Sequence, residues 1–294
     1  MLKQTLFFSH PARLSLKDNQ LVITLKDSNE MITRPIEDIG FMVIENQQII
    51  FTIPLLNELV HNNVSVILCD AKGMPSSMLM GLNNNATQAE SLKYQLNVSE
   101  PMRKQAWKQI VEQKIRNQAA VLDKLGIEHH NLKACYSSVL SGDTSNREGI
   151  AARQYWTQLF GKDFRREREG LPPNNLLNYG YAVLRAATAR ALIGSGLLPA
   201  LGLFHRNRYN AFPLADDVME PYRPYVDEIA FGETEEGMLE LDKETKVRLL
   251  NLLVTDVRIG KMTRPLSLAL TTTSASLLKY YKGETKKVTL PVFS

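Results

Sequence analysis

The feature that most constrains the fold of this chain is a change of hydrophobic periodicity a little before residue 100. Ahead of it, short apolar and β-branched runs alternate with turn residues, a pattern typical of strands; they occupy residues 20–25, 41–46, 49–53 and 64–70. Beyond it, apolar residues in the segment 101–126 recur three and four positions apart and stop at Gly126, as in a long amphipathic helix. The sequence therefore predicts a β-rich part followed by a helical part.

The polar, Asn-rich segment 81–97 separates the two patterns, and we place a domain boundary within it. We expect an α+β protein, with an N-terminal β-sandwich-like domain at residues 1–85 and an all-helical domain at residues 86–294. One short helix, 54–63, interrupts the strands. Further helices are expected at residues 130–140, 145–160, 175–193, 217–229, 243–257 and 274–281.

Composition narrows the class of protein. Of the 294 residues, 44% are hydrophobic and 22% charged, which is ordinary for a globular protein. The longest apolar run, 191–204, is too short to span a bilayer, and the N-terminus does not have the pattern of a signal peptide. The two cysteines, Cys69 and Cys135, are expected to be buried free thiols. We therefore expect a cytoplasmic protein with no membrane partner.

Acidic and imidazole side chains in the helical part are candidate metal ligands. Glu148 follows Ser145 by three residues, so a helix-capping box is the alternative interpretation of that carboxylate. His205 follows an apolar run. Asp217 and Glu220 are three residues apart, which puts them on one face of a helix; the alternative is an acidic first helical turn.

One imidazole with two or three carboxylates is a ligand set that suits Mg²⁺ or Mn²⁺ better than Zn²⁺. Such a site performs phosphoryl-transfer chemistry, because the metal stabilises charge on the phosphate oxygens. The sequence has no Walker motif, no GxGxxG and no HExxH, so it lacks the usual signals of an NTPase, a dinucleotide-binding enzyme or a metalloprotease.

Arginines near these residues are candidate contacts to a DNA backbone, since the guanidinium group binds phosphate in two-point fashion. Arg206 and Arg208 flank His205 closely and are the stronger candidates. Arg165 and Arg166 form a second basic cluster, which a solvated surface also explains because acidic residues alternate with it. The net charge of +4 does not establish a nucleic-acid partner by itself.

Together these segments resemble the CRISPR-associated integrase family, the metal-dependent enzymes of spacer acquisition. The resemblance is carried by a β-rich N-terminal part and by the segments NREGIAARQYW, LNYGYAVLRAATARAL and GLFHRNRYNAFPLADDVMEPYRP. It covers nearly the whole chain, and the compact length and the DDVMEPYRP form resemble the branch found beside type II effector nucleases. Where many relatives have Asp, this chain has Glu220, which is one methylene longer.

The resemblance implies roles for individual residues. Glu148, His205 and Glu220 match the metal ligands of the family, with Mg²⁺ or Mn²⁺ as cofactor. Asp217 matches a further acidic position of the catalytic site, a supporting residue or an occasional ligand. The implied reaction is a transesterification, in which a protospacer 3′-hydroxyl attacks a phosphodiester at the edge of a CRISPR repeat.

The resemblance also implies an assembly. The N-terminal domain would pair two subunits into a homodimer, and two such dimers would flank a dimer of a small ferredoxin-like CRISPR-associated protein in a heterohexamer. DNA is the implied substrate, and the type II effector nuclease is a possible further partner. Two other functions stay open at this point: a structure-specific nuclease acting on branched DNA, and a non-catalytic DNA-binding scaffold.

Overall fold

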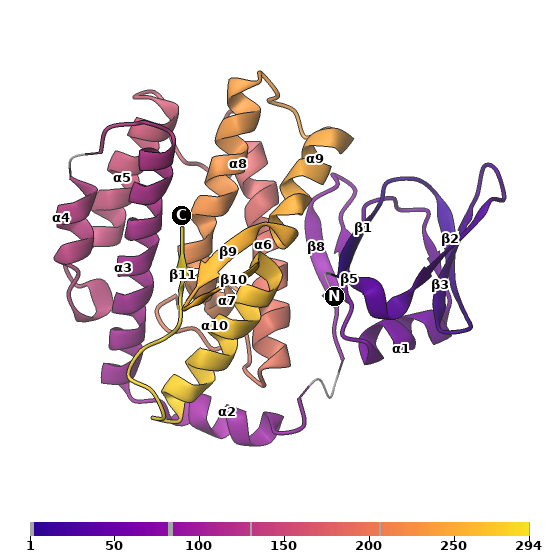
Figure 1. Ribbon diagram of the computed structural model, residues 1–294, viewed down its shortest axis with the longest axis horizontal. Helices are drawn as coiled ribbons and strands as arrows, with labels where there is room; N and C mark the ends of the chain where they lie inside the picture. Colours follow the sequence, from indigo (N-terminus) through magenta and orange to yellow (C-terminus); the bar gives the residue numbers. More distant parts are fainter. Residues whose placement is uncertain (1–2, 82–84, 130, 206, 294) are drawn as a thin grey trace. The chain divides into compact units, whose positions relative to one another are not determined.

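The computed structural model describes residues 3–81, 85–129, 131–205 and 207–293. The chain divides into two units, residues 1–84 and residues 85–294, which are taken separately below (Figure 1). The elements of the first unit are β1 (Gln4–Phe8), β2 (Ala12–Lys17), β3 (Gln20–Leu25), β4 (Met31–Pro35), η1 (Ile36–Asp38), β5 (Ile39–Ile44), β6 (Ile50–Phe51), α1 (Ile53–His61), β7 (Ser65–Cys69) and β8 (Pro75–Leu79).

The first unit contains two four-stranded sheets, with strand orders β1-β5-β7-β8 and β4-β3-β2-β6. Strand β5 is buried at all six positions because it lies between two parallel neighbours, β1 and β7, which explains its uninterrupted apolar sequence. Strands β2 and β3 form a hairpin through Asp18 and Asn19, whose φ angles are 50° and 59°. The β-rich character expected of this part is confirmed.

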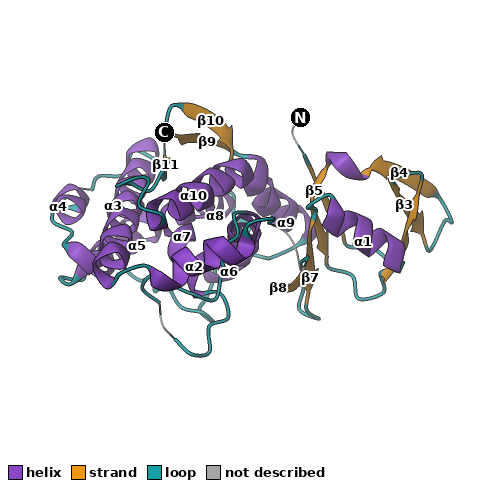
Figure 2. Ribbon diagram, turned by 90° about the horizontal axis from the view of Figure 1, so that it is seen from below, coloured by secondary structure: helices purple, strands orange, loops and turns teal. Residues whose placement is uncertain are grey.

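The second unit is built mainly of helices. Its elements are α2 (Gln88–Asn97), α3 (Glu100–Lys124), α4 (Leu132–Ser137), η2 (Ser141–Asp143), α5 (Arg147–Phe160), α6 (Asn174–Gly194), α7 (Pro213–Met219), η3 (Glu220–Tyr222), α8 (Arg223–Glu235), α9 (Lys243–Leu250), η4 (Asn251–Val254), β9 (Asp256–Ile259), β10 (Met262–Pro265), α10 (Leu266–Tyr281) and β11 (Pro291–Val292). Helix α3 packs against α4, α5, α7 and α8, while α6 packs against α7, α8, α9 and α10 (Figures 1 and 2).

The expectation of an all-helical second part is corrected by a small sheet with the strand order β10-β9-β11. Residues 256 and 257, expected at the end of a helix, begin strand β9, in which Val257 and Ile259 are buried and their neighbours exposed. This alternation has the period of a strand. Gly260, with a φ of 60°, begins the turn into β10, and helix α10 starts at Leu266, eight residues earlier than expected.

Two further segments differ from expectation. The polar segment 81–97 contains helix α2, which the Asn-rich composition had obscured. The C-terminal segment, for which no strand was expected within its own unit, contributes β11 to the sheet of that unit by pairing with β9. In the described ranges, every helix is too short or too polar to cross a membrane.

Candidate metal centre

A buried lysine on α3 lies between two glutamates that are distant from it in the sequence. The Nζ atom of Lys114 is 2.6 Å from Oε1 of Glu148, at the start of α5, and 2.6 Å from Oε2 of Glu220, at the start of η3. Burial alone would lower the pKa of Lys114, but the carboxylates of Glu220 and Glu148 outweigh burial and raise it. Lys114 is therefore a charged ammonium held by two carboxylates.

Glu148 is positioned by the turn that leads into α5. The carboxylate of Asp143 accepts the backbone N–H groups of Arg147 at 2.8 Å and of Glu148 at 2.9 Å, and the Asn146 side chain accepts that of Gly149 at 3.2 Å. The helix is thus capped by Asp143 and Asn146. The capping-box interpretation of Glu148 is wrong, because its side chain bonds to Lys114 instead.

Asp217, inside α7, holds the loop that carries His205. Its carboxylate accepts the backbone N–H groups of Leu203 at 2.6 Å, Phe204 at 3.0 Å and His205 at 3.3 Å, and it lies 2.5 Å from Nδ1 of His205. The loop passes close over the carboxylate at Gly202, where a Cβ atom would lie 2.6 Å from the His205 carbonyl oxygen and 3.1 Å from Oδ2 of Asp217. Asp217 therefore acts as a positioning residue for His205.

The imidazole of His205 packs edge-on against two aromatic rings, Trp107 at 5.7 Å and Phe204 at 5.6 Å between centroids. The hydrogen bond with Asp217 raises the pKa of His205 against the effect of burial, and the carboxylates of Glu220 and Glu148 raise it further. All three predicted ligands thus lie within electrostatic range of one another. With Nδ1 donating to Asp217, Nε2 is the ring nitrogen left for a metal.

Glu220 is buried, and a second cation contacts it. Nη2 of Arg223 lies 3.0 Å from its Oε1 atom. Burial opposes ionisation, but Arg223 and then Lys114 outweigh it and lower the pKa of Glu220. The backbone beside this carboxylate is tied to α3, since Asn117 donates to the carbonyl oxygen of Pro221 at 2.7 Å. The interpretation of Glu220 as a solvated first-turn carboxylate is therefore wrong.

Asp227 on α8 is a further buried carboxylate, and Arg223 links it to the site. It accepts hydrogen bonds from the hydroxyl groups of Tyr155, at 3.1 Å, and Tyr181. The guanidinium carbon of Arg223 lies 4.7 Å from the centroid of the Tyr181 ring, so Arg223 connects Glu220 with this group. Burial is the largest influence on Asp227 and raises its pKa to about 7.

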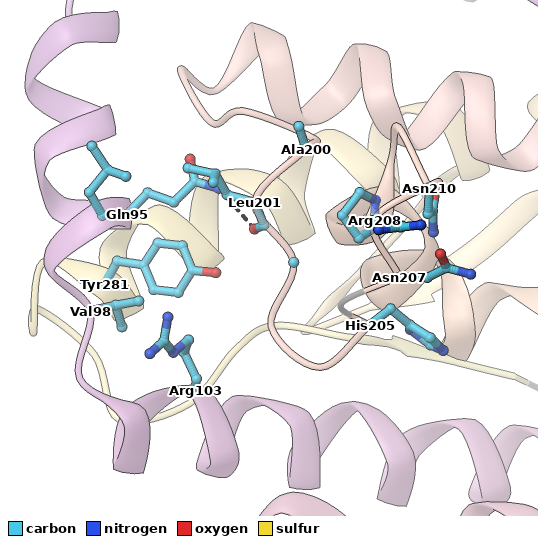
Figure 3. Close-up of a pocket in the computed structure, with 13 residues that line it drawn as sticks. Gln95, Val98, Arg103, Ala200, Leu201, His205, Asn207, Arg208, Asn210 and Tyr281 are labelled. Atoms are coloured by element: carbon cyan, nitrogen blue, oxygen red, sulfur yellow. Dashed lines mark hydrogen bonds between the residues drawn. The ribbon is translucent and has the colours of Figure 1, made fainter.

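A pocket of about 340 Å³ opens beside His205. Figure 3 shows residues of the loop between α6 and α7 on one side and Arg103 of α3 and Tyr281 of α10 on the other. Its polar lining comprises Gln95, Arg103, His205, Asn207, Arg208, Asn210 and Tyr281. Hydrogen-bond donors therefore surround a cavity that adjoins one of the predicted ligands.

The predicted DNA-binding arginines have different surroundings. Arg208 is exposed, and its guanidinium carbon lies 4.6 Å from the centroid of the Tyr209 ring. Arg165 is also exposed and donates to backbone carbonyl groups. Arg166 is half-buried, and its guanidinium donates to Asn174 at 2.9 Å and Asn178 at 2.8 Å, which ties it to α6. The predicted contact at Arg206 lies outside the described residues.

The donor set fits a hard divalent cation. Oε2 of Glu220 is buried and touches the Lys114 ammonium, yet the contact lacks hydrogen-bond geometry, so this oxygen retains coordination capacity. With the side chains as they stand, Lys114 lies between Glu148 and Glu220. No three His, Cys, Asp or Glu side chains are gathered at metal-binding spacing in the part of the chain that the structure describes.

Comparison with known proteins gives the family. Residues 6–256 match the family described as CRISPR associated protein Cas1, and the chain belongs to that family. It is 42% identical, over 89% of its length and 86% of the relative's, to the CRISPR-associated endonuclease Cas1 of Neisseria meningitidis serogroup C (strain 8013). The predicted family and the predicted class of CRISPR-associated enzyme are confirmed, and the Neisseria relative is consistent with the predicted type II-like branch.

Solved structures show the same fold at low sequence identity. A casposase bound to its integration product superposes with a TM-score of 0.80 at 20% identity, covering 98% of this chain and 92% of that one. A chain of a Cas6-RT-Cas1–Cas2 complex superposes with a TM-score of 0.74 at 19% identity, covering 97% of this chain and 35% of that one. The architecture is therefore shared well beyond relatives with recognisable sequence similarity.

Proposed function

We propose that this protein is a divalent-metal-dependent DNA integrase and endonuclease that inserts protospacer DNA into a CRISPR array. The observation that carries the proposal is the convergence of Glu148 and Glu220 on Lys114, 2.6 Å from each, with His205 oriented by Asp217 and within electrostatic range of both glutamates. Two carboxylates and an imidazole with one free nitrogen are the ligands that such an enzyme needs.

Glu148, Glu220 and Nε2 of His205 would hold Mg²⁺ or Mn²⁺. When bound, the ion would polarise the scissile phosphate and stabilise charge on the attacking and leaving oxygens. Asp217 keeps the proton of His205 on Nδ1, which leaves Nε2 unprotonated for ligation. A ligating His205 cannot also act as a general base through the same nitrogen. Its role is therefore to position the metal.

The reaction would be a direct transesterification. The oxygen of a protospacer 3′-hydroxyl forms a new bond to the phosphorus at the repeat edge, and the bond from that phosphorus to the 3′ oxygen of the adjoining nucleotide breaks. The attacking hydroxyl loses a proton, and the released 3′ oxygen takes one up. One phosphodiester is exchanged for another, so no nucleotide cofactor is consumed. The polar pocket beside His205 would bind the DNA next to the reacting phosphate, and exposed Arg208 would contact its backbone.

We further propose that the protein acts as a homodimer joined through its N-terminal unit. Large apolar side chains in that unit are exposed, among them Ile50 at 60% and Ile53 at 68%. Two dimers flanking a dimer of a small ferredoxin-like partner would form a heterohexamer. The name of one structural neighbour, a complex containing Cas1 and Cas2, supports a Cas partner. The type II effector nuclease is a further proposed partner.

The test is a joining assay with the protein and its partner, a short DNA duplex, a repeat-containing plasmid, and Mg²⁺ or Mn²⁺. We expect joined products from the wild type and none from Glu220→Gln. Glu228→Gln is the matched control, because Glu228 is on α8 and pairs with Lys124 outside the site. Cut ends without joining would indicate a structure-specific nuclease. DNA binding without either product would indicate a scaffold.

A further inference from the structure

Lys114 lies between the two carboxylates of the proposed metal site and contacts both. It is part of α3, a helix of 25 residues whose neighbouring turns bury Trp107, Val111 and Ile115. Only 10% of its side chain is exposed, against 21% for Glu148 and 4% for Glu220. The ammonium therefore cannot move away without leaving two largely buried carboxylates close together.

The ammonium and a divalent metal would use the same oxygens. Lys114 contacts Oε1 of Glu148 and Oε2 of Glu220, and the other oxygen of Glu220 faces Arg223 at 3.0 Å. A bound Mg²⁺ or Mn²⁺ lies about 2.0–2.2 Å from a carboxylate oxygen. A dication at that distance from both oxygens would repel an ammonium that already touches them.

We propose that the ammonium of Lys114 is a built-in cation of the metal centre. It holds Glu148 and Glu220 together before the metal binds, and it competes with the metal for their oxygens. This inference rests on the proposed function, because it assumes that the metal binds at these carboxylates. Lys114 is thus a positioning residue whose ammonium stabilises the metal-free protein and weakens metal affinity.

The experiment compares Lys114→Met with the wild type in the full-length protein. Lys108→Met is the matched control, because Lys108 is on the same helix and its ion pair with Glu112 is longer, at 3.6 Å, and more exposed. Melting temperatures are measured in a chelator, and Mn²⁺ affinity is measured by titration calorimetry. We expect Lys114→Met to melt below the wild type in chelator and to bind Mn²⁺ about tenfold more tightly. Lys108→Met should match the wild type in both.

The outcomes separate the inference from the function on which it rests. If the wild type binds no Mn²⁺, the proposed metal site is wrong. If the wild type binds Mn²⁺ while Lys114→Met binds it equally or more weakly, the site stands and the competition by Lys114 is wrong.

A double variant covers the case in which Lys114→Met does not fold. Glu220→Gln already neutralises one of the two carboxylates, so adding Lys114→Met to Glu220→Gln should give a folded protein that melts only slightly below Glu220→Gln. A double variant that fails to fold, like Lys114→Met alone, would overturn the proposed bridge.

Discussion

Nδ1 of His205 lies 2.5 Å from Oδ1 of Asp217, a residue that is fully buried. The same carboxylate accepts backbone N–H groups from the loop that carries the histidine, so one side chain sets both the position of the loop and the orientation of the ring. A carboxylate behind a ligating histidine is a common arrangement in metal enzymes, because it fixes which ring nitrogen faces the metal.

This pair predicts how metal binding depends on pH. His205 must be neutral to ligate, and Asp217 raises its pKa, so Mn²⁺ affinity should fall as the pH drops through that raised value. Asp217→Asn removes the largest cause of the raised pKa and should move the loss of affinity to lower pH. Calorimetric titration between pH 6 and 9 measures this. Equal midpoints in the two proteins would contradict the assignment.

Asp227 predicts a pH dependence of stability that does not involve the metal. Its pKa rises from an ordinary 3.8 to about 7, chiefly because of burial. Between these values the folded protein holds a proton that the unfolded chain has lost, so the carboxyl contributes stability at low pH that disappears as the pH rises. Across that window the free energy of unfolding should change by an amount on the order of 4 kcal/mol, because each pH unit between the two pKa values is worth about 1.4 kcal/mol.

Asp227→Asn should remove this titration. In urea unfolding, the free energy of unfolding of Asp227→Asn minus that of the wild type should increase from pH 5 to pH 8. Asp163→Asn, at an exposed residue, should give the same difference from the wild type at both pH values. A constant difference for Asp227→Asn as well would show that the group titrates near its ordinary pKa.

The acidic and histidine residues of the proposed site were easier to predict from the sequence than the ion pairs that hold them. The resemblance selected Glu148, His205, Asp217 and Glu220, and the structure brings all four into one region. The sequence interpretation missed Lys114, although a signal existed: it falls on the buried face of α3, in helical register with Trp107 and Val111. A lysine on an apolar face is rarely buried without a partner.

Other contacts could not be predicted because they depend on tertiary packing. Asn117 holds Pro221 and the C-terminal strand through hydrogen bonds that span more than 100 residues, and no local pattern encodes that pairing. The strand at 256–259 was missed for a different reason. It is four residues long, and its alternation directly follows a helical pattern that was extended too far.

The exposed apolar residues of the first unit predict the dimer interface. Ile53→Glu places a charge where Ile53, at 68% exposure, would be buried by the partner subunit. We expect the variant to dissociate at micromolar concentration, while the wild type remains a dimer with an interface of about 1,200 Å² or more. Light scattering measures the mass. Leu171→Glu, at a residue 84% exposed in the second unit, should leave the dimer intact. A monomeric wild type would refute the proposed dimer.

The neighbouring arginines Arg165 and Arg166 offer a comparison between DNA binding and structure. Arg166 is tied to Asn174 and Asn178, so Arg166→Ala should lower the free energy of unfolding by about 1–3 kcal/mol, because it loses two hydrogen bonds from a charged group. Arg165→Ala should leave stability unchanged, because that guanidinium is exposed and donates only to nearby carbonyl groups.

For DNA binding we expect the opposite pattern, with an effect of the substitution at Arg165 and none at Arg166. Arg208→Ala and Arg165→Ala should each weaken affinity similarly for unrelated sequences, and the slope of log affinity against log salt should shrink by about 0.9 for each phosphate that the variant no longer neutralises. Arg166→Ala should leave that slope unchanged, because its donors are already engaged within the protein. Fluorescence anisotropy across a salt series measures both quantities. A reduced slope for Arg166→Ala with normal stability would mean that this guanidinium leaves Asn174 and Asn178 to bind phosphate. In that case the loop before α6 belongs to the DNA-binding surface.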